Sequence, residues 1–207
     1  MIAMARPSGH DNVQGHRIGP NAVLQLHDVL EREEGAQIRR ALFACADLIP
    51  PPPDAGMLPE DEVARLHHAL RLYLPHKAPH LSRLAGLAVG DYILANRIPK
   101  LAQRLIKALP APLGARLLAI AITKHAWTFA GSGAFRVVNH RPLTFEIANN
   151  PLVASDTAAT PQCHWHAAVF ERLFSQLVWP DVTVEETTCC ACGDPACVFV
   201  LHPNGKH

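Results

Sequence analysis

The chain has 207 residues, of which 49% are hydrophobic and 18% are charged, so it can bury one core and does not require two domains. The formal net charge is +1 with 13 histidines counted as neutral, so no overall field would gather nucleic acid or an anionic membrane. Any basic patch must therefore be local. We expect a flexible N-terminal arm at residues 1–19 and a single domain at residues 18–203.

Two absences suggest where the chain works. Residues 1–20 contain no apolar stretch of the kind that a secretory signal has. No run approaches the ~18 apolar residues of a spanning helix. We expect a cytoplasmic protein without a membrane span, and in a reducing compartment clustered cysteines are more often metal ligands or redox groups than disulfides.

Helical periodicity dominates the first two thirds of the chain. An apolar stripe follows Asn21, a candidate N-cap, and Gly35 should end it. A second stripe occupies residues 38–49, before the stiff segment 50–53. Further helices, each opened near a proline, are expected at residues 59–73, 79–96, 99–109 and 112–129.

The helices expected between residues 97 and 124 are locally basic. The cations are Arg97, Lys100, Arg104, Lys107, Arg116 and Lys124. A solvated helix face is the favoured interpretation, and a docking surface for carboxylates or for a partner protein is the alternative.

The pattern changes after residues 131–133, Gly-Ser-Gly. Segments 135–138 and 143–147 are short and rich in β-forming residues, and a second pair follows at 182–188 and 196–201. One helix separates the two pairs. The order of elements predicts an α+β fold, with helices packed on a four-stranded antiparallel sheet.

Five of the six cysteines lie between Cys163 and Cys197. Thr160 and Pro161 have the character of an N-cap and a first helical residue, which would place Cys163 near the third position of a helix. There the helix dipole favours a thiolate, and the side chain would continue the apolar stripe of that helix toward the core.

Glu186 is a carboxylate on the face of a strand that Val182 and Val184 predict to be buried. Such a charge must be protonated, paired or bound to a cation. Cys197 shares a face with two apolar residues of the partner strand, and Cys189 lies just beyond the first strand, so both sulfurs can approach Glu186.

Three thiolates from Cys163, Cys189 and Cys197 and one carboxylate from Glu186 suit tetrahedral Zn²⁺. A site closed by four protein ligands favours a structural role over catalysis. Cys190, Cys192 and His166 are competing ligands. A redox dithiol and unmodified thiols are the alternatives to a metal.

The pattern Glu186-x2-Cys189-x3-Gly193-Asp194-x2-Cys197-x-Phe199, with Cys163 upstream, resembles the C-terminal signature of the 4-vinyl reductase domain family. The resemblance covers about residues 18–203. It implies a fold similar to transport-particle subunits and phenol-sensor domains, often dimeric and enclosing an apolar cavity. In the phenol-responsive relatives a zinc site resembles the same four positions.

The resemblance also implies a role in bacteriochlorophyll biosynthesis and photosynthesis, at the step where a divinyl tetrapyrrole becomes monovinyl. Reduction of a vinyl group needs a hydride source, and the sequence has no Gly-x-Gly-x2-Gly loop for a nicotinamide or flavin. We therefore favour a carrier or accessory protein that binds a Mg-tetrapyrrole intermediate, such as divinyl protochlorophyllide or a precursor, and serves other pathway enzymes. The alternative is the reductase itself.

Candidate pigment contacts are His125, Trp127 and Phe129, because an imidazole can ligate the Mg²⁺ of a chlorin while aromatic rings pack on the macrocycle. A histidine satisfied within an aromatic-lined core is the more frequent arrangement.

Overall fold

The structure of the protein, a computed structural model, describes residues 15–203. Of the predicted arm, residues 1–14 lie outside the described part. The first half of the chain is mainly helical, with a short antiparallel pairing of two strands. Its elements are β1 (Arg17–Ile18), α1 (Asn21–Cys45), β2 (Leu58–Pro59), α2 (Glu60–Tyr73), α3 (Ala78–Asn96), α4 (Lys100–Ala108), α5 (Ala111–Lys124) and α6 (Trp127–Ala130).

The second half contains the four-stranded antiparallel sheet, in the order β3-β4-β6-β5. Its elements are β3 (Ala134–His140), β4 (Leu143–Ala148), the 3-10 turn η1 (Pro151–Val153), α7 (His164–Leu177), β5 (Val182–Thr188), the 3-10 turn η2 (Cys190–Cys192) and β6 (Ala196–Pro203). This confirms the predicted α+β class and both predicted strand pairs.

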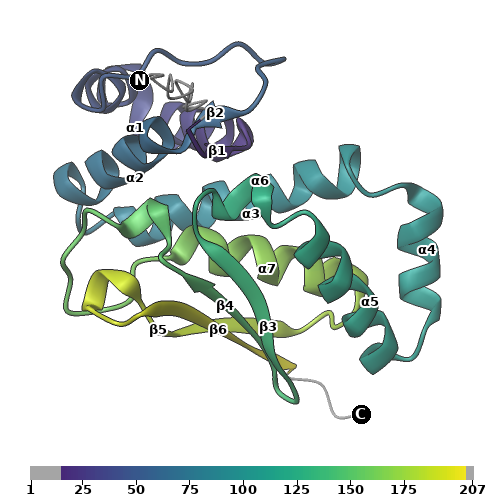
Figure 1. The fold of residues 1–207 in the computed structure, drawn as a ribbon. Helices are drawn as coiled ribbons and strands as arrows, with labels where there is room; N and C mark the ends of the chain where they lie inside the picture. The colour runs from purple at the N-terminus through teal and green to yellow at the C-terminus, as the bar shows by residue number, and fades with distance from the viewer. Residues whose placement is uncertain (1–14, 204–207) are drawn as a thin grey trace, which may run out of the picture.

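Helix α7 lies between the sheet and α3, and α1 and α2 lie beyond α3 (Figure 1). Its inward side chains Phe170 and Phe174 are fully buried against Phe145 of β4, with ring centroids 5.0 and 5.8 Å away. Gly86 of α3 faces α7 so closely that a Cβ there would collide with the carbonyl oxygen of Trp165. The core is therefore centred on α7, which both the sheet and α3 hold in place.

Three predicted helix boundaries differ from the structure. Gly35 does interrupt α1, with φ 83°, but Asn21 is the first helical residue and not the cap. The helix predicted at residues 112–129 is two helices, because the chain turns at His125 and α6 packs beside β1, where the Gly19 N–H donates to the Thr128 carbonyl at 2.7 Å.

The third difference concerns the metal-ligand candidate Cys163. It is the N-cap of α7, one residue before the helix, and not its third residue. Its backbone N–H donates to Glu186 Oε2 at 2.6 Å, so a carboxylate from β5 fixes where the helix begins. Within residues 15–203, no helix is long and apolar enough to cross a membrane.

His67 of α2 is a buried titratable group that joins the helical layer to α7. Its Nε2 lies 3.2 Å from the carbonyl oxygen of Ala22, and its ring meets the edge of Trp165 at 5.8 Å. Burial, with Arg71 nearby, lowers the pKa of His67 from 6.5 to about 3. The folded protein therefore holds this imidazole neutral at neutral pH.

This burial should make the fold sensitive to mild acid. In the unfolded chain His67 takes up a proton below about pH 6.5, whereas in the folded chain it does so only near pH 3. Its contribution to stability is therefore present above pH 6.5 and is lost as the pH falls toward 3. Between pH 7 and pH 5 we expect a loss of about 2 kcal/mol in the free energy of unfolding. Urea titrations of the wild type and of His67→Gln at both pH values test this, and equal pH dependence in the two proteins would contradict it.

Candidate metal centre

The four predicted metal ligands come from three elements that meet at one end of the sheet. Cys163 caps α7, Glu186 lies on β5, Cys189 follows β5, and Cys197 lies on β6. The sheet register pairs Glu186 with Phe199, two residues from Cys197 and on the same inward face. One ligand atom from each of the four residues lies within 4.8 Å of all the others. The structure thus brings together the four residues that the sequence nominated.

The spacing of the three sulfur atoms fits a metal. Cys163 Sγ lies 3.4 Å from Cys197 Sγ and 3.9 Å from Cys189 Sγ, and the remaining pair is 3.9 Å apart. Zn–S bonds of ~2.3 Å at tetrahedral angles place sulfurs about 3.8 Å apart. The three thiols are buried, so protein atoms and not solvent surround this space.

Glu186 completes the set with a carboxylate that lacks a full complement of partners. Its Oε2 accepts the hydrogen bond from the Cys163 N–H, whereas Oε1 is buried with no hydrogen-bond partner among the described residues. Burial raises the pKa of Glu186 to about 8, and the charge of Cys189 adds to the effect. A buried acceptor without a donor is costly unless a cation occupies that direction.

The thiols show the same need for a cation. Burial, followed by hydrogen bonds to the other two thiols, raises the pKa of Cys163 well above its usual range. Hydrogen bonds from Cys163 and Cys197 hold the pKa of Cys189 far below its usual range. The cluster by itself therefore concentrates one negative charge on Cys189, whereas a bound Zn²⁺ would favour deprotonation of all four ligands.

Polar groups around the cluster hold the sulfurs in place. Asn150 is fully buried, and its Nδ2 donates to Cys163 Sγ at 3.3 Å and to Cys197 Sγ at 3.5 Å. The Cys190 N–H donates to Cys197 Sγ at 3.4 Å. Asp194 Oδ2 accepts from the Cys189 N–H at 2.9 Å, in a turn that Gly193 makes with φ 91°.

Asn150 is a residue that the sequence interpretation missed. It had been seen only as part of the Asn-Asn-Pro end of a strand pair. An asparagine directly before a proline that opens a turn is a local pattern for a cap, and the Asn150 Oδ1 does accept the Leu152 N–H at 3.2 Å. Nothing local indicates that its amide reaches two sulfurs, because Cys197 is 47 residues away.

The competing ligands lie outside the four-residue cluster. Cys192 is exposed and Cys190 is half-buried in η2. His166 points into the aromatic core, with ring centroids 4.8 Å from Trp165 and 6.0 Å from Phe199. The geometry therefore favours the set Cys163, Glu186, Cys189 and Cys197.

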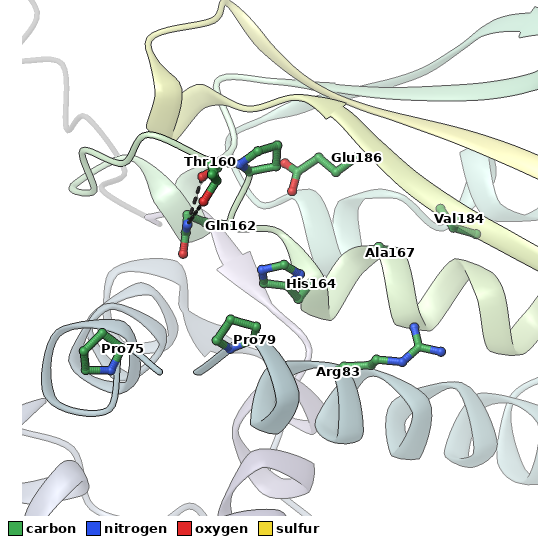
Figure 2. Close-up of a pocket in the computed structure, with 10 residues that line it drawn as sticks. Pro75, Pro79, Arg83, Thr160, Gln162, His164, Ala167, Val184 and Glu186 are labelled. Carbon is green, nitrogen blue, oxygen red and sulfur yellow. Dashed lines mark hydrogen bonds between the residues drawn. The ribbon is translucent and has the colours of Figure 1, made fainter. Parts of the chain in front are cut away.

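A pocket of about 500 Å³ adjoins the cluster on the side of Glu186 (Figure 2). It is open to solvent on one side, and Glu186 lines it from β5 while Arg83 lines it from α3. The other lining residues are Pro75, Pro79, Thr160, Pro161, Gln162, His164, Ala167 and Val184. Half open and mixed in polarity, this pocket differs from the enclosed apolar cavity that the family resemblance implies.

The three pigment-contact candidates occupy different environments. His125 ends α5 and is exposed, and Trp127 at the start of α6 is exposed as well. Phe129 is half-buried and joins the aromatic core, with ring centroids 5.4 Å from Phe135 and 5.9 Å from Phe170. Only Phe129 therefore has a packing role within the fold.

Comparison with known proteins relates the whole chain to one group and its C-terminal part to one family. The model of the 4-vinyl reductase domain family matches residues 143–203, which hold all four ligand candidates. The bacteriochlorophyll synthase 23 kDa chain of Cereibacter sphaeroides is 64% identical over 191 residues, covering 92% of this chain and 93% of that protein. The protein of the same description from Rhodobacter capsulatus is 58% identical over 190 residues, covering 92% and 89%.

Among solved structures, an Fe(II) unliganded H-NOX protein from K. algicida has a similar fold. The TM-score is 0.61 at 11% sequence identity, and the alignment covers 91% of this chain and 98% of that one. At this identity the similarity concerns the fold alone.

Zinc content provides a direct test of the cluster. The purified protein should contain about one zinc per chain, and Cys197→Ser should weaken zinc binding by more than the ~10–100-fold that loss of an outer partner costs. Cys192→Ser is the matched control, since that thiol is exposed and outside the cluster, and it should keep its zinc. Wild-type protein with less than about a tenth of an equivalent of zinc and freely titratable thiols would exclude the site.

Asn150→Ala should weaken zinc binding without removing a ligand. Loss of the two N–H···S hydrogen bonds should lower the zinc affinity about 10–100-fold, as loss of outer-shell partners does in other sites. Competition with a chromophoric chelator measures this. Asn96→Ala serves as the control, because that side chain is exposed and bonds only within its own helix. Equal affinities for the two variants would show that Asn150 has no such role.

Proposed function

The chain belongs to the family of the bacteriochlorophyll synthase 23 kDa chains, and from this membership we propose that it takes part in bacteriochlorophyll biosynthesis by binding a Mg-tetrapyrrole intermediate. The observation that carries the proposal is 64% identity over nearly the full length of both proteins. In this proposal the chain acts as a carrier or accessory for other pigment-biosynthesis enzymes.

Zinc has a structural role in the proposal. Three thiols and a carboxylate supply all four positions of a tetrahedral ion, so a bound zinc would offer no open position to a substrate. Held there, the ion would fasten the start of α7 to β5 and β6. The residues themselves orient the ligands and exclude water, through the bonds of Asn150 and Asp194 described above.

The Gly131-Ser-Gly133 turn supports a binding protein over a self-sufficient reductase. It is the segment most similar to a phosphate-binding loop, yet the Ser132 N–H donates to Glu60 Oε2 at 2.6 Å. A Cβ at Gly131 would collide with the same carboxylate, and one at Gly133 would lie 2.9 Å from the Ala130 carbonyl oxygen. A carboxylate and the chain itself thus occupy the space that a cofactor phosphate would need.

The fold is compatible with a tetrapyrrole ligand, because H-NOX proteins of similar fold contain a heme. We retain His125, Trp127 and Phe129 as proposed pigment contacts. The first two are exposed and available to a ligand. Further parts of the proposal are a cytoplasmic location and a homodimer, which sedimentation velocity would test.

Incubation with divinyl protochlorophyllide, with and without NADPH, distinguishes a carrier from an enzyme. We expect pigment binding, seen as a shifted absorption band, without formation of the monovinyl product. The proposal rests on a ligand that is held and not converted. Turnover by the purified chain would contradict the carrier and establish the reductase alternative.

A paired substitution locates the pigment in the same experiment. His125→Ala should weaken binding if this imidazole ligates the Mg²⁺. His80→Ala, an exposed histidine on α3, is the control. Unchanged affinity in both variants would remove His125 from the proposed site.

A further inference from the structure

Helices α4 and α5 form the end of the molecule opposite η2 and the metal cluster (Figure 1). They pack against each other, and each buries only part of its surface. Ile106 is the buried residue of α4, and its carbonyl oxygen lies close to Gly114 of α5. Most of the α4 surface therefore takes no part in the core.

Large apolar side chains cover the outward sides of both helices. On α4, Leu101 and Leu105 are one turn apart and 77% and 56% exposed. On α5, Leu113, Leu117 and Ile120 follow the spacing of one helix stripe and are 55%, 38% and 58% exposed. These five side chains, which we call the α4–α5 apolar face, are left without a partner in the described structure.

Cations surround the α4–α5 apolar face. Between Asp91 and Glu146 the chain contains no aspartate or glutamate. The same two helices carry the exposed cations Lys100, Arg104, Lys107, Arg116 and Lys124. Among residues 15–203, none of these five has a carboxylate within ion-pair distance. The overall charge of +1 conceals this segregation.

We propose that the α4–α5 apolar face docks on an anionic lipid surface. Helices with leucines on one side and lysines or arginines on the other lie in the membrane interface, where leucines enter the acyl boundary and cations meet lipid phosphates. The exposed indole of Trp127, just beyond α5, belongs to the side chains enriched at that depth. The attachment is peripheral and places the metal cluster at the end that points away from the lipid.

A lipid surface fits these observations better than an acidic protein. The apolar and basic side chains lie on the outward sides of two helices, and no hydrogen-bonding group among them requires a partner of defined geometry. A bilayer satisfies both kinds of side chain at once. The solvated basic face favoured from the sequence thus becomes one half of an amphipathic surface.

Co-sedimentation of the full chain with lipid vesicles tests the proposal. Vesicles of phosphatidylcholine and phosphatidylglycerol in equal parts should bind the protein, whereas pure phosphatidylcholine should bind it weakly. Added salt should weaken binding to the mixed vesicles. Arg104→Glu with Lys107→Glu should weaken it at least about fivefold for each residue, because each cation near an anionic surface contributes about that much.

The apolar contribution has a matched control. Leu105→Ser with Leu117→Ser should lower binding to the mixed vesicles about tenfold or more. Ile49→Ser with Leu72→Ser changes equally exposed apolar side chains outside the proposed face, at 86% and 60% exposure, and should leave binding unchanged. Circular dichroism and zinc content verify that each variant is folded.

Three outcomes would overturn the proposal. One is no binding to the mixed vesicles at low salt. Another is equal binding to neutral and anionic vesicles, which removes the role of the cations. The third is an α4–α5 variant that binds as the control does; if that variant instead changes self-association in sedimentation velocity, the face is an interface between protein chains.

Discussion

Three thiols and a carboxylate buried together where α7 begins are the constraint on which the rest of the structure depends. Four such acidic groups cannot all be charged in a water-poor site without a cation, and Glu186 keeps a buried oxygen without a donor among the described residues. The same carboxylate accepts the Cys163 N–H and so fixes the first turn of α7. One interaction thereby joins the cluster to the helix at the centre of the fold.

The position of α7 has consequences in both directions. Toward the sheet, its phenylalanines form an aromatic core with Phe145. Toward the helical layer, the close approach of Gly86 brings α3 against it, and His67 meets the edge of Trp165. The cluster that looked like an active centre in the sequence is therefore better understood as a support, and the proposed functions lie on other surfaces: pigment binding near α6 and lipid docking on α4 and α5.

Local patterns predicted much of this arrangement. Two-residue alternation placed Glu186 and Cys197 on inward strand faces, which was enough to nominate the ligand set and the antiparallel sheet. Long-range contacts explain what was missed. Pro161 has the local character of a helix start, but a carboxylate 23 residues from Cys163 places that start later. The bond from Gly19 to Thr128 accompanies the break after α5, and the reach of Asn150 to Cys197 spans 47 residues.

X-ray absorption at the zinc edge of the purified protein tests the central claim most directly, because it reports the identity and distance of the atoms around the ion. The account predicts three sulfur neighbours at ~2.3 Å and one oxygen neighbour at ~2.0 Å. A shell of four sulfurs would replace Glu186 by Cys190 or Cys192. A shell of nitrogen and oxygen alone would show that zinc lies elsewhere and that the buried thiols do not hold it.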